Sequence, residues 1–118
     1  MGHQHGMAVS YTVHSGVMPI LDHLAGLTAD SLFGIDMAFP GLSLAAVRDG
    51  LSASKALWIG PSSTHHLWSG AEATREAVRQ VFCTFDRTGL ILAPGVSAHS
   101  IMPWESTLAM LEVWRELR

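Results

Sequence analysis

The chain has 118 residues, of which 48% are hydrophobic and only 14% are charged, and its formal net charge is −3 with neutral histidines. This length corresponds to one domain, and the charged fraction lies well below the roughly 25% of an average soluble protein. Lys and Arg form no run, which excludes the basic surface of a nucleic-acid-binding protein. No apolar stretch approaches the ~20 residues of a membrane span. We therefore expect a single domain that covers part of its surface with another chain or a second copy of itself.

The start of the chain, MGHQHG, lacks a cationic segment followed by an apolar core, so we expect no signal peptide. Residues 1–6 are interpreted as a flexible start or a tag remnant, although the histidines of HQH could also bind a metal. Cys83 is the single cysteine and cannot form an internal disulfide, which favours a reducing compartment. We predict a cytoplasmic protein whose residues 7–118 form one domain.

The first half of the chain predicts two strand–helix units. MAVSYTVH (7–14) is β-branched and aromatic, as is typical of a strand. The segment after it begins at Pro19 and has leucines and isoleucine near helical spacing. DSLFGIDM (30–37) predicts a second strand, and LSLAAVRDG (42–50) predicts a short helix that ends at Gly50.

The second half predicts two further units. KALWIG (55–60) indicates a third strand, and Ser69 with Glu72 has the S-x-x-E spacing of a capping box before the next helix. The apolar face expected for that helix consists of Ala77, Val78, Val81, Phe82 and Phe85. GLILA (89–93) indicates a fourth strand, and Pro103 begins the last helix. The face of this helix that we expect to be buried consists of Trp104, Leu108, Leu111, Trp114 and Leu117.

The order of these elements predicts the fold class. Strand and helix alternate four times, and the strands are apolar throughout instead of alternating with polar residues. That pattern is typical of parallel strands covered by helices. We predict an α/β fold of four βα units.

A polar group follows each predicted strand. His14 ends the first strand, Asp36 ends the second, and hydroxyl and imidazole groups follow the other two. Because ligands of parallel α/β folds bind at the carboxyl ends of the strands, we predict a small-molecule site there. The candidate catalytic residues are His14, Asp36, His65 and His99, and the candidate substrate-binding residues are Ser63, His66, Trp68 and Ser97. The alternative is that these are ordinary loop and helix-capping residues, with Trp68 packed against a helix.

The spacing of the residues bears on two more specific kinds of site. Imidazoles at His14, His65 or His66, and His99, with the carboxylate of Asp36, are suitable zinc ligands. None has a diagnostic spacing such as H-E-x-x-H, so we assign no metal. GPSSTHHLWSG contains no lysine and is therefore not a Walker A loop.

The C-terminal segment ILAPGVSAHSIMPWESTLAMLEVWREL resembles the last βα unit of the uroporphyrinogen decarboxylase superfamily, which includes cobalamin- and corrinoid-linked methyltransferases. There a strand of the type ILAPG-C/H precedes a P-x-E helix start, which Pro103 and Glu105 match. VHSG followed by PILDHLAGLTADSL is similar to the family's H-x-C/D-G … P-I-L turn and helix. LAAVRDGLSASKALWIG resembles its next helix and strand. The resemblance covers residues 7–118.

The resemblance implies the C-terminal half of a (β/α)8 barrel. A closed barrel of this kind takes roughly 200 residues or more, and four parallel strands alone leave an open edge. We therefore expect a half-barrel that is completed by a homodimer or by an N-terminal half-barrel partner.

The resemblance also has departures that concern the chemistry. The methyltransferase branch holds zinc with H-x-C and with a cysteine after APG, whereas this chain has Ser15-Gly16 and Val96 at those places. In the decarboxylase branch a histidine occupies the position of Val96, and His99 lies three residues beyond it. The resemblance thus implies decarboxylase or methyl-transfer-related activity after assembly, with no cofactor assigned. The alternative is a ligand-binding, metal-binding or structural association module that has lost this chemistry.

Overall fold

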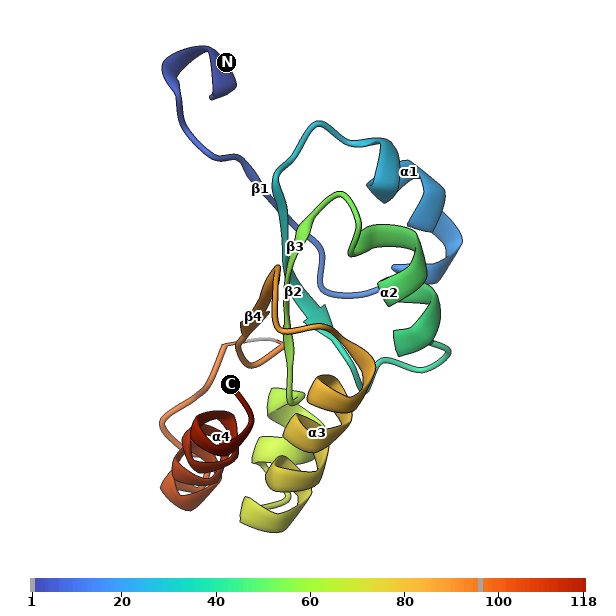
Figure 1. Ribbon diagram of the computed structural model, residues 1–118. Helices are drawn as coiled ribbons and strands as arrows, with labels where there is room; N and C mark the ends of the chain where they lie inside the picture. Colours follow the sequence, from blue (N-terminus) through green and yellow to red (C-terminus); the bar gives the residue numbers. More distant parts are fainter. Residues whose placement is uncertain (1, 96) are drawn as a thin grey trace.

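The computed structural model describes residues 2–95 and 97–118, which form an α/β fold around a four-stranded parallel sheet (Figure 1). The strands lie in the order β1 (Ser10–Thr12), β2 (Ser31–Asp36), β3 (Ala56–Gly60) and β4 (Leu90–Leu92). The helices are α1 (Leu21–Gly26), α2 (Leu44–Leu51), α3 (Ala71–Thr84) and α4 (Trp104–Leu117). Shorter helical turns are η1 (His3–His5), η2 (Met18–Ile20) and the π-helical η3 (Ser63–Leu67). The prediction of four βα units with parallel strands is confirmed.

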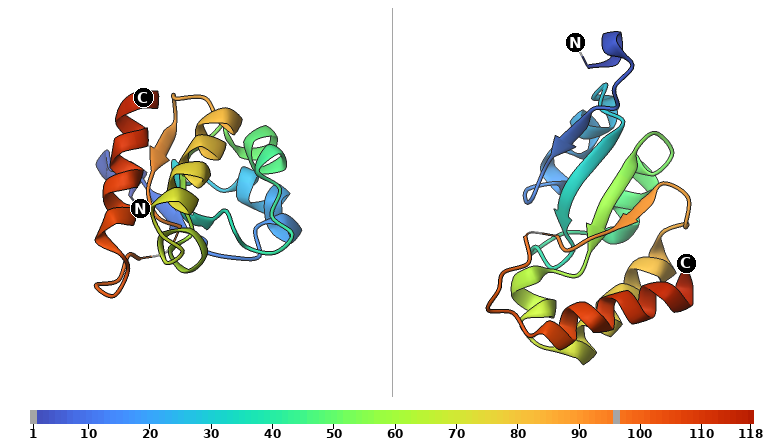
Figure 2. Two further views of the ribbon diagram at one scale, coloured as in Figure 1. Left: turned by 90° about the horizontal axis from the view of Figure 1, so that it is seen from below. Right: turned by 90° about the vertical axis from the view of Figure 1, so that its left-hand side faces the viewer.

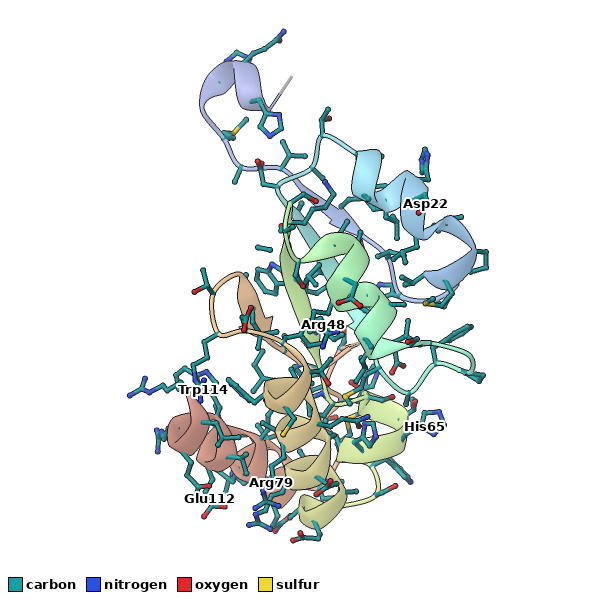
Figure 3. The ribbon with its side chains drawn as sticks, turned by 45° about the vertical axis from the view of Figure 1, so that its right-hand side comes forward. Asp22, Arg48, His65, Arg79, Glu112 and Trp114 are labelled. Carbon is teal, nitrogen blue, oxygen red and sulfur yellow. The ribbon has the colours of Figure 1, made fainter. Side chains whose placement is uncertain are left out.

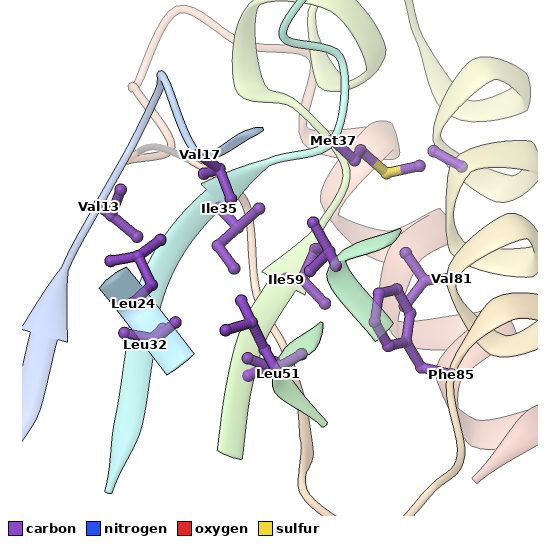
Figure 4. Packing of buried hydrophobic residues seen from close by; sticks show 13 residues of the cluster. Val13, Val17, Leu24, Leu32, Ile35, Met37, Leu51, Ile59, Val81 and Phe85 are labelled. Carbon is purple, nitrogen blue, oxygen red and sulfur yellow. The ribbon is translucent and has the colours of Figure 1, made fainter. Parts of the chain in front are cut away.

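One face of the sheet carries the hydrophobic core. Leu32 and Ile35 of β2 and Ile59 of β3 point toward the helices and are fully buried (Figure 4). Leu24 of α1 and Leu51 of α2 pack against them. Because successive strand residues point to opposite faces, the residues between these lie on the other side of the sheet.

The other face of the sheet is open. Figure 2 shows, in its right-hand view, strands with α1 and α2 behind them and no described helix in front. The half-buried rings of Phe33 and Trp58 lie on this face, with their centroids 5.2 Å apart in an edge-to-face arrangement. The strand order leaves β1 and β4 as the two edges of the sheet.

The predicted end of α2 at Gly50 is wrong. The helix continues through Gly50 to Leu51. A Cβ at Gly50 would lie 3.1 Å from a methyl group of Leu21, so the small residue allows α1 and α2 to approach closely. Gly50 is thus a packing position and not a helix stop.

The predicted capping box before α3 is also wrong. Gly70, with φ 105°, occupies the N-cap position and has no side chain that could cap. The Ser69 hydroxyl instead donates to the carbonyl of His65 at 2.5 Å. The predicted apolar face of α3 is confirmed. Ala77, Val78, Val81 and Phe85, which follows the last residue of the helix, are buried, and Phe82 is half-buried against Val78.

The buried face predicted for α4 is wrong. The buried residues of this helix are Ser106, Ala109, Met110 and Val113. Trp104, Leu108 and Leu111 are exposed instead. Met110 and Val113 pack with Val78 of α3, and α4 therefore lies beside α3.

The N-terminal turn η1 contacts the carboxylate of Asp30 through His3. Asp30 Oδ2 lies 2.6 Å from the Val9 amide nitrogen and 2.7 Å from His3 Nε2. The Val9 hydrogen bond, followed by that of His3, lowers the pKa of Asp30. The assignment of residues 1–6 to a flexible start or tag remnant stays a prediction.

Among residues 2–95 and 97–118, the helices are all too short or too polar to cross a lipid bilayer.

Candidate functional site

The candidate site begins with a hydrogen bond that joins the ends of two neighbouring strands. Asp36 is the last residue of β2, and Ser62 follows β3 after a single proline. The Ser62 hydroxyl donates to Asp36 Oδ2 at 3.1 Å, and the Ala38 amide donates to Asp36 Oδ1 at 3.0 Å. Among the described residues each carboxylate oxygen has one hydrogen-bond donor, and a carboxylate oxygen can accept a second.

His66 is held by the same serine. The Ser62 amide donates to His66 Nδ1 at 2.9 Å, so this ring nitrogen is the acceptor and the proton of the neutral ring lies on Nε2. Burial lowers the pKa of His66, the nearby carboxylate of Asp36 opposes that effect, and His65 adds to it. His66 is therefore a neutral hydrogen-bond donor through Nε2 at physiological pH.

The turn that positions His66 is a single π-helical turn. The amides of His66 and Leu67 both donate to the Ser62 carbonyl, at 2.9 and 3.0 Å. Buried Thr74 of α3 fixes the end of the turn, because its hydroxyl lies 3.2 Å from the His66 carbonyl. Single π turns occur frequently at functional sites, because they reposition one side chain relative to the regular helix.

The first strand is shorter than the predicted 7–14, because β1 ends at Thr12, and His14 lies two residues beyond it, beside β2. Its Nδ1 is 3.3 Å from the Gly34 carbonyl, and its ring meets that of Phe33 edge-on with centroids 6.2 Å apart. A Cβ at Gly34 would lie 2.6 Å from His14 Nδ1, and Gly34 has φ 88°. Glycine is therefore required at this position both by the backbone and by the imidazole that fills the space beside it.

The segment after β4 crosses the ends of β2 and β3. A Cβ at Gly60 would lie 2.2 Å from the Ala93 carbonyl oxygen, and one at Gly95 would lie 2.8 Å from the Cα of Asp36. The Gly95 amide donates to the Pro61 carbonyl at 3.0 Å. Two glycines thus let this segment approach the Asp36–Ser62 pair. Val96, which the resemblance places at the family's ligand position, lies outside the described residues.

The remaining predicted residues are not gathered around Asp36 by any described contact. His65 is exposed on the outer side of η3 (Figure 3), and Ser97 is exposed after β4. Trp68 and His99 line a shallow hollow of about 350 Å³ together with Thr64, Ile101 and Met102. Ser63 is buried within η3. The predicted set therefore has three parts. Asp36 lies with His66, His14 is joined to Asp36 through its carbonyl, which accepts the Asp36 amide at 3.4 Å, and the residues around the shallow hollow form a separate rim.

A second hollow lies at the carboxyl edge, between the loops after β1 and β2. It has a volume of about 240 Å³ and is lined by residues 16–19 and 39–42, which are mostly apolar. Its rim includes Phe39, which is exposed. This edge of the fold thus offers an apolar surface as well as polar groups.

Metal ligation was tested on the arrangement of the ligating side chains. Within residues 2–95 and 97–118, no group of three or more His, Cys, Asp or Glu side chains is close enough to hold a metal ion. The zinc set considered from the sequence is not assembled among these residues.

Sequence reasoning did not select Ser62, the residue that connects Asp36 and His66. The adjacent Ser63 was chosen instead, and both follow the third strand in a run of hydroxyl residues. Ser62 is completely buried and bonds through both its amide and its hydroxyl. A possible signal was its position directly after Pro61, where the chain leaves the strand.

Chemically, the cluster combines a hydrogen-bonded carboxylate with a neutral imidazole. The carboxylate of Asp36 can accept a proton or a hydrogen bond, and His66 can donate one. Such a pair can orient a polar ligand that carries both a donor and an acceptor. No protein-family model matches the chain, and no curated protein matches it.

Proposed function

We propose that this chain is a half-barrel of the uroporphyrinogen decarboxylase type, with a small-molecule site at the carboxyl ends of its strands. The site serves decarboxylation or a methyl-transfer-related reaction once a second half completes the barrel. The sequential parallel order β1-β2-β3-β4 and the open sheet face support a half-barrel. The resemblance of residues 7–118 supports the reaction class.

The observation that carries the proposal is the Asp36–Ser62–His66 cluster. A buried serine connects a carboxylate at the end of β2 with an imidazole beyond β3. This is the edge at which parallel α/β folds bind their ligands. Asp36 is confined by two donors and His66 by one, so both groups are preorganised for a ligand.

In the proposed reaction the role of each side chain follows from whether it can accept or donate a hydrogen bond. Asp36 accepts a hydrogen bond from the substrate, because its carboxylate oxygens are acceptors that two protein donors hold in place. His66 donates through Nε2 to a carbonyl or carboxylate oxygen of the substrate. His14, beside the Phe33 ring, contacts the substrate from the open face of the sheet.

The test uses uroporphyrin, a stable oxidised analogue of the family's tetrapyrrole substrate, in a thermal-unfolding assay. Ligand that binds the folded state at about 100 times its Kd stabilises it by about 2.7 kcal/mol, which raises the Tm measurably. We expect Asp36→Asn and His66→Gln to remove this shift. His23→Gln, on the exposed side of α1, is the matched control and should retain it. An absent shift, or a shift of equal size in all variants, contradicts the proposal.

A second candidate function is structural association without catalysis. It is favoured by the exposed apolar side chains of β4 and α4, namely Ile91, Trp104, Leu108 and Leu111. The same thermal-unfolding assay distinguishes the two functions. An association module shows a concentration-dependent Tm and no response to the tetrapyrrole.

A further inference from the structure

Helix α4 is apolar on two sides. One side, with Met110 and Val113, packs against α3. The other side carries Trp104, Leu108 and Leu111, whose exposed fractions are 66%, 49% and 39%. These three residues follow one another at spacings of four and three, so they form one stripe along the helix. A helix with two apolar sides is one that lies between two neighbours, and α3 is only one of them.

A groove runs between this stripe and the edge strand β4. It has a volume of about 320 Å³ and is lined by Leu90, Ile91, Leu92, Met110, Leu111 and Trp114. Trp114 projects from α4 in Figure 3. An apolar groove beside an unpaired strand edge is a template for a further strand whose side chains fill the groove.

The opposite edge of the sheet, β1, has the complementary character. Its residues Ser10, Tyr11 and Thr12 are all exposed. Val13 belongs to the core on the helix side of the sheet, so Tyr11, two residues earlier, points to the same side. Tyr11 is 46% exposed and therefore presents a large aromatic side chain at the helix side of an open edge.

We propose that two copies of this chain pair β4 of each copy with β1 of the other, so that Tyr11 of one copy fills the β4–α4 groove of the second. A two-fold axis parallel to the strands makes both contacts at once and keeps every strand parallel. The resulting closed sheet has no edge, and its interior contains the rings of Phe33 and Trp58. A second copy is the occupant because this chain carries both the groove and the strand that fits it.

The proposed contact leaves the candidate site within each chain. The segment after β4 turns away from the sheet edge and crosses the ends of β3 and β2, where Gly95 approaches Asp36 and the Gly34–His14 contact. Each copy therefore keeps its own Asp36–Ser62–His66 cluster, and the pairing of β1 with β4 can be tested separately from ligand binding.

The experiment measures the mass in solution by light scattering after size exclusion. We expect a homogeneous species of twice 12.7 kDa. Tyr11→Asp and Leu111→Asp place a charge in the apolar contact and should each weaken the dimer roughly 100-fold or more, which halves the mass. Phe39→Asp is the matched control, since Phe39 is 41% exposed but lies at neither edge strand, and it should leave the mass unchanged. Circular dichroism verifies that each variant is folded.

A charge-pair variant makes the assignment specific. The double variant Tyr11→Lys with Leu111→Asp places opposite charges across both proposed contacts and should recover part of the dimer that Leu111→Asp loses. A folded wild-type monomer, a dimer unaffected by both single substitutions, or open-ended oligomers overturn the proposal. Failure of the proposed function is a separate result: the dimer then responds to the substitutions as described, but uroporphyrin does not stabilise it. A wild-type monomer that binds uroporphyrin overturns only the dimer.

Discussion

Ser62 and Asp36 are joined by a hydrogen bond of 3.1 Å between the serine hydroxyl and Oδ2 of the carboxylate. The two residues are distant in the sequence, and the bond ties the end of β2 to the segment after β3. The same serine also holds His66 through its amide. Ser62 is thus the residue on which the geometry of the candidate site depends.

The first prediction concerns the Ser62 hydroxyl. Ser62→Ala removes one of the two protein donors to Asp36 at a completely buried position. We expect the free energy of unfolding to fall by about 1–3 kcal/mol, because a hydrogen bond to a charged group is lost. Urea unfolding measures this loss of unfolding free energy. Ser69→Ala, which removes an exposed hydroxyl, should change stability by less than about 0.5 kcal/mol. Equal losses in the two variants would show that the Ser62–Asp36 bond adds no stability.

The second prediction concerns pH. Burial lowers the pKa of His66 below its ordinary value of 6.5, so the unfolded chain binds the proton at a higher pH than the folded chain does. The contribution of neutral His66 is therefore fully present above about pH 6.5 and is lost as the pH falls through this value toward the folded-state pKa. Urea unfolding at a series of pH values should show this decline.

Variants assign the pH dependence to one histidine. His66→Gln should flatten the decline below about pH 6.5, since glutamine does not titrate. His23→Gln removes an exposed histidine and should leave the decline in place. The titration of the His66 ring, followed by NMR, should have its midpoint below 6.5, and a midpoint above that value would refute the assignment.

The third prediction uses two glycines with similar backbones. Gly34 and Gly41 have φ values of 88° and 81°, but a Cβ would meet neighbours only at Gly34, namely His14 Nδ1 at 2.6 Å and the Gly95 carbonyl oxygen at 3.3 Å. Gly41→Ala should cost about 1–3 kcal/mol of backbone strain. Gly34→Ala should cost more, because the imidazole must also move. Adding His14→Ala to Gly34→Ala should remove most of this excess, and equal costs for both glycines would indicate that His14 does not occupy the space.

The fourth prediction tests which side of α4 is buried. Met110→Ala should cost about 2–5 kcal/mol, because it leaves a cavity against α3. Leu108→Ala should change the stability by less than about 0.5 kcal/mol in the Tyr11→Asp background, where the proposed dimer contact is removed. Chemical denaturation of both variants shows which side of α4 is buried. A larger loss for Leu108→Ala would mean that the side predicted from the sequence is the buried one.

The alternation of strands and helices follows from the sequence by itself. Apolar periodicity is a local property, and it located β2, β3 and α3 to within a few residues. The same alternation predicted that Asp36 and His66 lie at one edge, because the carboxyl ends of parallel strands meet there. Four parallel strands and a polar carboxyl edge were therefore predictable without coordinates.

Tertiary structure decided the points at which local signals were ambiguous. Both sides of α4 are apolar, so only its packing against α3 could select Met110 and Val113 over Leu108 and Leu111. At the start of α3, the left-handed backbone of Gly70 displaced the expected cap by Ser69.

In the candidate site, too, the sequence determines some features and the tertiary structure decides the others. Ser62 and Ser63 are adjacent and chemically identical, as are His65 and His66, and no local pattern separates the members of either pair. The π-helical turn orients His66 toward the Ser62 amide and leaves His65 exposed. The sequence alone thus determined which chemical groups reach the edge of the sheet. The contact between β2 and the turn after β3 decided which of them meet, because hydrogen bonds depend on positions in space that a local sequence pattern does not specify.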